Sequence, residues 1–268
     1  MNLLLFYSNL AKTIETAGSV VNEIIIDWEN KGKEIRQVNY DTEVNKHTLA
    51  DLIELRKYYD RKIICRVNGG QFFNEREVKS AIDAGADELF LPMVTHPREV
   101  EKMMRFTKEQ CALSILVETK SAVTQIEQLT QFALAKIYFG LNDYAIDCGV
   151  KNIFLPLTDG TVKKVANHCK ARNIPFGFGG LTHPDLGYPI SAKLLLAEMV
   201  RCHASFSFLR RTFYRDLNAY SPNEIYNSIQ TNHSILHDTS AKILETYHQQ
   251  LTVQIQSTSY EKHVSCSH

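Results

Sequence analysis

The sequence has no excess of charge of either sign. Its 268 residues include 30 Lys and Arg and 30 Asp and Glu, so the formal net charge is zero. The basic residues are dispersed, without a Lys- or Arg-rich run of roughly five to eight residues of the kind that binds nucleic acid. Because affinity for a polyanion depends mainly on clustered positive charge, we expect no nucleic-acid partner.

Long hydrophobic runs and paired cysteines are also missing. No stretch approaches the roughly 18 apolar residues of a membrane-spanning helix, and the apolar start at 2–7 lacks the basic segment that precedes a secretory signal. The six cysteines show no CxxC spacing and lie mostly in expected strands and helices, where Cys acts as a small hydrophobic residue. We therefore expect a cytoplasmic protein with reduced thiols and no membrane partner.

Short apolar runs, in contrast, are abundant and alternate with amphipathic stretches. Eight of them read as strands, at 2–7, 23–28, 62–67, 88–94, 112–118, 136–141, 174–179 and 204–209. Strands that are apolar along their whole length are typical of parallel sheets covered by helices. A GxGxxG fingerprint, which would favour an open doubly wound sheet, does not follow the first strand. The pattern predicts an α/β protein with a (β/α)8 TIM barrel.

Helical periodicity fills the segments between these runs, most clearly at 74–86 and 158–173. After Tyr220 a Ser-Pro start and three-to-four-residue apolar spacing predict a helical extension. We expect a barrel catalytic domain at 1–220, an extension of the same domain at 221–256 and a polar tail at 257–268. The extension has two possible roles, to cover the outside of the barrel or to meet another subunit.

Charged and polar residues gather at the carboxyl ends of the expected strands, where (β/α)8 enzymes carry their chemistry. In chain order these residues are Asp27, Glu29, Arg66, Asn68, Glu118, Asn142, Asp143, His183, Arg210 and Arg211. Four carboxylates and at least one arginine thus face the same mouth of the barrel. Carboxylates held close together in a poorly solvated cleft need a cation or an arginine to offset their repulsion.

Glu118 and Asp143 follow neighbouring strands and suit a hard cation such as Mg2+, which is typically held by one or two carboxylates. The planar fork of Arg66 suits a carboxylate or an enolate oxygen of a substrate. Asp27 and Glu29 would orient water and Arg66 around the ion. Structural roles stay open for the same residues: Glu118 and Asp143 as acidic residues at helix N-termini, and Asp27 as a scaffolding partner of Arg66.

Five segments together resemble the HpcH/HpaI aldolase and citrate lyase beta-subunit family of magnesium-dependent (β/α)8 enzymes. "IIIDWEN" is similar to its strand-two "DLED" element, "CRVNG" to "VRVN" and "GADELFLPMV" to "GAD…LPK" or "PMV". "ILVETKSAV" is similar to "IExPxA" and "YFGLNDYAIDCG" to "FGxxDLAxDLG". The segments occur in the family's order over about residues 20 to 150.

The resemblance implies a metal-dependent carbon–carbon lyase or aldolase that acts on a 2-oxo acid or related carboxylate through an enolate. It assigns Glu118 and Asp143 to Mg2+, with Mn2+ as an alternative, and Arg66 to catalysis and to the substrate. Asp27, Glu29 and Asn142 would complete the substrate site. A homo-oligomer is also implied, whereas coenzyme A binding is not carried over because the similarity fades beyond residue 150.

The chain departs from the family at three places. Met93 stands where the lyase branch has a Lys, and Asn142 where it has a Glu. The stretch 29–34, "ENKGKE", has no histidine where the aldolase branch has one, so the general base is unassigned. Two other function classes stay open: a catalytically weak carboxylate-binding barrel, and a phosphoenolpyruvate-type carboxyl or phosphoryl transfer enzyme, for which the glycine-rich "GFGGLTHP" would hold phosphate.

Overall fold

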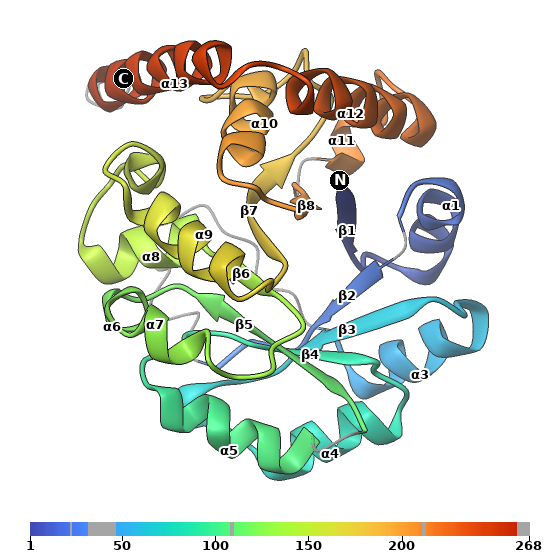
Figure 1. Ribbon diagram of the computed structural model, residues 1–268. Coiled ribbons are helices and arrows are strands. Elements are labelled where there is room, and N and C mark those ends of the chain that lie inside the picture. Colours follow the sequence, from blue (N-terminus) through green and yellow to red (C-terminus); the bar gives the residue numbers. More distant parts are fainter. Residues whose placement is uncertain (22, 32–46, 108–109, 211–212, 262–268) are drawn as a thin grey trace, which may run out of the picture.

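The computed structural model describes residues 1–21, 23–31, 47–107, 110–210 and 213–261. Parallel strands pair in chain order and close into a barrel, because β8 also pairs with β1 (Figure 1). The strands are β1 Asn2–Phe6, β2 Glu23–Asp27, β3 Lys62–Arg66, β4 Glu88–Leu91, β5 Ala112–Val117, β6 Ile137–Phe139, β7 Phe176–Leu181 and β8 Phe206–Leu209. Each lies within or overlaps one of the eight predicted runs, so the predicted (β/α)8 fold class is confirmed.

Helices surround the barrel and separate successive strands (Figure 1). They are α1 Leu10–Val20, α3 Leu49–Tyr58, α4 Glu75–Asp83, α5 Pro97–Thr107, α6 Lys120–Thr124, α7 Ile126–Leu129, α8 Leu141–Cys148, α9 Thr161–Ala171, α10 Ala192–Arg201, α11 Phe213–Asp216, α12 Pro222–His237 and α13 Ala241–Glu261. Two 3-10 turns, η1 Gly70–Phe72 and η2 Leu155–Leu157, add to them. The helices expected at 74–86 and 158–173 are α4 and α9.

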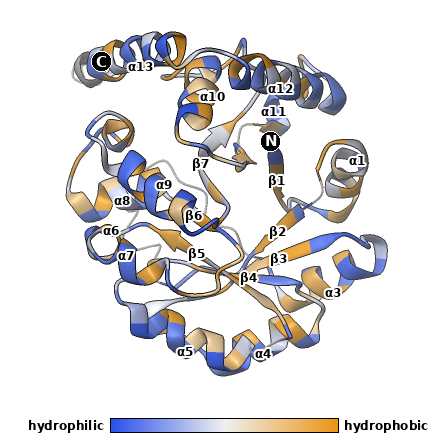
Figure 2. Cartoon of the chain, viewed as in Figure 1, coloured by the Kyte–Doolittle hydropathy of each residue, from blue (hydrophilic) through white to orange (hydrophobic). Residues whose placement is uncertain are grey.

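The strands are buried on both faces, which explains why their sequences do not alternate. Side chains inside the barrel form one cluster: Leu4, Ile25, Ile64, Phe90, Leu116, Tyr138, Phe206 and Phe208. A second cluster fills the layer between the strands and the helices. Figure 2 shows the corresponding pattern, with hydrophobic strands at the centre and helices that carry both hydrophobic and hydrophilic residues.

The amino-terminal end of the barrel is closed by a buried ionic network. The Lys136 ammonium lies 2.8 Å from Glu23 Oε2 and 2.7 Å from Glu88 Oε2. Ser114 Oγ donates to Glu88 Oε1 at 2.6 Å, and Asn2 Nδ2 donates to Glu23 Oε1 at 2.8 Å. Because the chemistry of such barrels lies at the opposite end, this network serves stability.

The carboxyl-terminal helices cover the outside of the barrel. α12 packs against α1 and α10, and α13 packs against α10 (Figure 1). A capping box between Ser221 and Glu224 starts α12, as the Ser-Pro and Glu pattern predicts. α13 continues to Glu261, past the boundary expected at residue 256. His248 Nδ1 in α13 lies 2.9 Å from Glu198 Oε2 in α10, and this contact ties the two helices together.

The five cysteines within the described ranges are free, and four of them are buried, in agreement with their interpretation as small core residues. Cys266 lies outside the described residues. No helix in the described part of the chain is long and apolar enough to cross a membrane.

Candidate active site

Arg66 and Asp27 form a buried ion pair at the carboxyl ends of two neighbouring strands. They are register partners in the pairing of β2 with β3. Arg66 Nε donates to Asp27 Oδ1 at 2.8 Å and Nη2 donates to Oδ2 at 2.7 Å, so the fork is bidentate. Arg66 Nη1 lies 3.4 Å from Glu29 Oε2. The two carboxylates thus fix the plane of the guanidinium, which also lies over the Phe6 ring at 5.5 Å.

This arrangement keeps Arg66 charged despite its burial. Burial lowers the pKa of Arg66, but the carboxylates of Asp27 and Glu29 outweigh burial and hold that pKa well above its usual value. The Glu29 N–H donates to Asp27 Oδ1 at 3.2 Å, so the turn after β2 is itself tied to the pair. The site therefore carries a permanent positive charge in a rigid setting.

Glu118 follows β5 directly and is buried beside the same group. Its Oε2 accepts a hydrogen bond from the Met93 N–H at 3.1 Å. Met93 adopts a left-handed φ of 53°, a conformation that is uncommon for a residue other than glycine. A Cβ atom at Gly140 would lie 2.5 Å from Glu118 Cγ and Oε1. The lack of a side chain at residue 140 thus makes room for the Glu118 carboxylate.

The charge of Glu118 is strongly affected by its surroundings. Burial, followed by the negative charges of Asp143 and Glu29, raises the pKa of Glu118 from 4.5 to about 8. Arg66 and the hydrogen bond from Met93 act in the opposite direction. Asp143 and Glu29 are therefore close enough to Glu118 to share one electrostatic site with it.

Asp143 is buried in the first turn of α8. The N-cap of α8 is Gly140, and the N-cap of α6 is Thr119, whose hydroxyl accepts from the Ala122 N–H at 3.0 Å. Neither Glu118 nor Asp143 is therefore an N-cap residue. The interpretation of Glu118 as a helix-capping residue is not supported by this geometry.

The donor set fits a hard divalent cation. Asp27, Glu29, Glu118 and Asp143 are all buried, and Arg66 is the cation that contacts the first two. Glu118 and Asp143 form a two-carboxylate set, and no group of three or more Asp, Glu, His or Cys ligands occurs among the described residues. Mg2+ commonly uses one or two carboxylates and completes its octahedron with water and substrate oxygens.

The remaining predicted residues take different positions. Asn142 is the half-buried neighbour of Asp143 in α8. Asn68 links two loops: its Nδ2 donates to the Trp28 carbonyl and to Glu77, and its Oδ1 accepts from the Lys31 N–H at 3.0 Å. Asn68 thus holds the loop after β2 against the end of β3.

His47 lies beside the candidate site, which the sequence did not reveal. Its Nδ1 accepts a hydrogen bond from the Asp27 N–H at 2.9 Å, so Nδ1 carries no proton in this arrangement. The ring meets Tyr7 edge to face, with centroids 5.2 Å apart. His47 precedes α3 and is far from Asp27 in sequence, and no motif marks it. Part of the histidine-free stretch 29–34, residues 32–34, lies outside the described residues.

A separate cluster occupies the β7 and β8 side of the mouth. The His183 ring stacks on Tyr220 with centroids 4.0 Å apart, and its Nδ1 accepts from the Asp185 N–H at 3.3 Å. Asp216 accepts from Thr182 and lies 3.5 Å from Arg210 Nη2. The contacts of His183 with Tyr220 and Asp185 fix its ring within the loop that follows β7. Arg211 lies outside the described residues.

Comparisons with known proteins place this chain in a family. A model described as "HpcH/HpaI aldolase/citrate lyase" matches residues 14–177. The chain belongs to the HpcH/HpaI aldolase/citrate lyase family. This match extends beyond the stretch of about residues 20 to 150 that carries the sequence resemblance, and the family is one of aldolase- and citrate lyase-type enzymes. A search of curated proteins gave no match.

Solved structures of the family share the fold. A HpcH/HpaI aldolase/citrate lyase family protein from Burkholderia cenocepacia J2315 has a TM-score of 0.61 at 15% identity, over 81% of this chain and 91% of that one. A citrate lyase from Burkholderia xenovorans LB400 has a TM-score of 0.60 at 13% identity, over 96% and 92%. Citrate synthase SbnG has a TM-score of 0.58 at 17% identity, over 81% and 90%. At these identities the comparison establishes the fold.

Proposed function

We propose that this family member is a metal-dependent carbon–carbon lyase or aldolase that acts on a 2-oxo acid or related carboxylate through an enolate. The observation that carries the proposal is the buried Glu118 and Asp143 pair beside the fixed guanidinium of Arg66. This combination offers a site for a divalent cation and a hydrogen-bond donor for a substrate oxygen among buried side chains.

Glu118 and Asp143 would hold Mg2+, or Mn2+ as an alternative. The ion supplies Lewis acidity toward the oxygens of the 2-oxo acid. Without an ion, Glu118 is largely protonated near neutral pH, because its pKa is raised to about 8. Binding of the ion therefore requires Glu118 to lose its proton, so affinity rises with pH.

Arg66 would act on the enolate oxygen as the catalytic residue. Asp27 holds the Nε and Nη2 atoms of Arg66, and Glu29 lies beside Nη1. The guanidinium therefore reorganises little while negative charge grows on the substrate. Removal of one such preorganised donor typically costs about 3–4 kcal/mol, or roughly a hundred- to thousand-fold in rate. Asp27 and Glu29 would thus act mainly by positioning Arg66, and Asn142 would contact the substrate.

The substrate class follows from the charge of the site and from the neighbours. The fixed charge of Arg66 and the proposed metal site at Glu118 and Asp143 suit a small carboxylate with a neighbouring oxo group. Two structural neighbours, a citrate synthase and a citrate lyase, are named for citrate, a small carboxylate. We keep coenzyme A out of the proposal. A homo-oligomer and a cytoplasmic location remain part of it, the latter because the described cysteines are free thiols.

Exchange of deuterium into the methyl group of pyruvate tests the proposal, because exchange requires only the enolate. We expect exchange with Mg2+ or Mn2+, none after chelation, and a loss of at least about a hundredfold in Glu118→Gln, Asp143→Asn and Arg66→Lys. Asp147→Asn is the matched control, because Asp147 lies on the same helix and accepts from the Lys120 N–H at 2.8 Å. Ligand binding without exchange would favour a carboxylate-binding barrel instead.

A further inference from the structure

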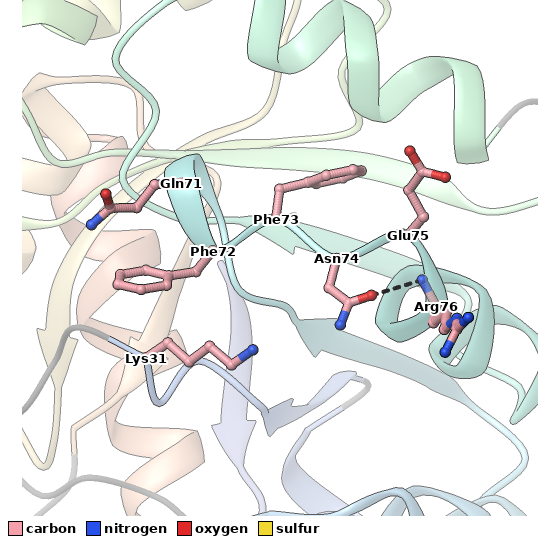
Figure 3. Close-up of a pocket in the computed structure, with 7 residues that line it drawn as sticks. All are labelled: Lys31, Gln71, Phe72, Phe73, Asn74, Glu75 and Arg76. Atoms are coloured by element: carbon pink, nitrogen blue, oxygen red, sulfur yellow. Dashed lines mark hydrogen bonds between the residues drawn. The ribbon is translucent and has the colours of Figure 1, made fainter.

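We propose that a cleft beside the active site binds the second, electrophilic substrate through a phosphate monoester. The cleft, of about 530 Å³, lies between Lys31 in the loop after β2 and the chain from η1 to the start of α4 (Figure 3). This inference rests on the proposed function, since it names the partner that the enolate would attack.

The cleft adjoins the site through the backbone of the loop after β2. Glu29 contacts Arg66, and Lys31 lies two residues further on. Two residues of chain span at most about 7 Å. Asn68 holds this short connection in place by accepting from the Asn30 and Lys31 N–H groups at 3.2 and 3.0 Å. A substrate of a few carbons is therefore long enough to reach from Arg66 to the cleft.

The charge of the cleft is opposite in sign to that of the inner site. Lys31 and Arg76 both line it, and neither forms an ion pair within the described part of the chain. Glu75 contributes one negative charge, which leaves a net charge of plus one. The inner site has four carboxylates around one arginine. Arg66 and the ion would hold the carboxylate of the 2-oxo acid, so a second anionic group, on the acceptor, is attracted to the outer cleft instead.

The cations flank the cleft from two directions. In Figure 3 Lys31 and Phe72 lie on one side and Asn74 and Arg76 on the other, and the Lys31 ammonium points toward Asn74. Asn74 Oδ1 accepts from the Arg76 N–H at 3.0 Å, which leaves its Nδ2 as a donor. Two cations and an amide donor match a dianion with several oxygens better than a single carboxylate, so we assign a phosphate monoester.

Phe72 supplies the apolar wall for the carbon chain. It is half-buried and lines the cleft, whereas Phe73 is engaged elsewhere, with Phe106 at 5.6 Å and the Lys102 ammonium at 4.1 Å. The inferred substrate is therefore a short aldehyde or ketone with a terminal phosphate. In the forward reaction the enolate carbon bonds to the carbonyl carbon, the electron pair of the C=O bond moves to oxygen, and this oxygen takes up one proton.

Condensation of pyruvate with glyceraldehyde 3-phosphate, glyceraldehyde and an aldehyde of similar length with a terminal carboxylate tests the inference. We expect kcat/KM of the wild-type protein to be at least about tenfold higher for the phosphate ester than for either other acceptor. Lys31→Gln and Arg76→Gln should each raise KM for the phosphate ester several-fold, with KM for the uncharged glyceraldehyde unchanged. Lys79→Gln is the control, because Lys79 lies on α4 and pairs with Asp83 at 3.0 Å.

The deuterium exchange of pyruvate separates the two proposals. Exchange should be unchanged in the Lys31 and Arg76 variants, because the enolate forms without the acceptor. If the wild-type protein exchanges pyruvate but uses glyceraldehyde as well as its phosphate, or prefers the carboxylate, the cleft inference is wrong and the enolate chemistry stands. If the wild-type protein neither exchanges nor condenses, both proposals are wrong.

Discussion

Glu118 should make the chelated protein less stable as the pH rises. Its pKa is 4.5 ordinarily and about 8 in the folded chain. Between these values the folded protein holds a proton that the unfolded chain has lost, so the free energy of unfolding falls with increasing pH. The stabilisation is complete below the unfolded pKa and is lost as the pH passes the folded pKa. At about 1.4 kcal/mol per pH unit, the loss between pH 5 and pH 8 is on the order of 4 kcal/mol.

Urea denaturation in the presence of EDTA measures this effect. Wild-type protein and Glu118→Gln are compared at about pH 5 and about pH 8, because glutamine keeps the shape of the side chain and has no proton to lose. The difference in the free energy of unfolding between the two proteins should shift in favour of the variant at the higher pH. Glu127→Gln is the control, since Glu127 is an exposed residue of α7.

Parallel stability profiles for wild type and Glu118→Gln would refute the reasoning, because they would mean that Glu118 titrates alike in the folded and unfolded chains. Saturating Mg2+ gives a second comparison. The ion binds the ionised carboxylate, so it should stabilise the wild-type protein more at about pH 8 than at about pH 5. It should leave the stability of Glu118→Gln nearly unchanged.

Three further changes have defined expected results. Gly140→Ala places a Cβ atom 2.5 Å from Glu118 Cγ, so it should weaken Mg2+ binding by at least about tenfold in calorimetry; unchanged affinity would mean that Glu118 is not a ligand. Lys136→Met removes the cation that pairs with Glu23 and leaves Glu88 with Lys62 alone, at 3.3 Å. It should lower the free energy of unfolding by about 3–5 kcal/mol in urea titrations, with little change in ligand affinity of the folded protein. His47→Leu removes the acceptor of the Asp27 N–H and should lower kcat with little change in KM for pyruvate, and His47→Gln should restore part of it; equal activity in all three proteins would remove His47 from the site.

The fold was predictable because a closed parallel barrel leaves a clear signature. Strands such as β2 are buried on both faces, and its central residues Ile24, Ile25 and Ile26 are therefore all apolar. The same geometry brings strand ends together, which is why the sequence predicts that Asp27, Arg66 and Glu118 face the same mouth of the barrel. Boundaries were less accurate: the apolar run at 88–94 continues past the end of β4 at Leu91, because the segment after the strand is also buried.

Contacts between distant loops were not predictable. His47 lies 20 residues after Asp27 in the sequence, and no sequence pattern indicates that the two residues are in contact. The sequence marks Met93 only as a departure from the lyase branch, whereas in the structure its backbone N–H, set by a left-handed φ, contacts Glu118. The sequence does not predict the Lys136 network, because its charged residues lie at the starts of strands, where charged side chains are usually exposed to solvent.

Calorimetric titration of the chelated protein with Mg2+, with and without oxalate, tests the metal-dependent enolate site most directly. Oxalate resembles the enolate of pyruvate in charge and shape, so it should bind together with the ion. We expect Mg2+ to bind the wild-type protein and Asp147→Asn, to bind more tightly with oxalate, and not to bind Glu118→Gln. Absence of Mg2+ binding to the wild-type protein, or equal binding to Glu118→Gln, would contradict the account.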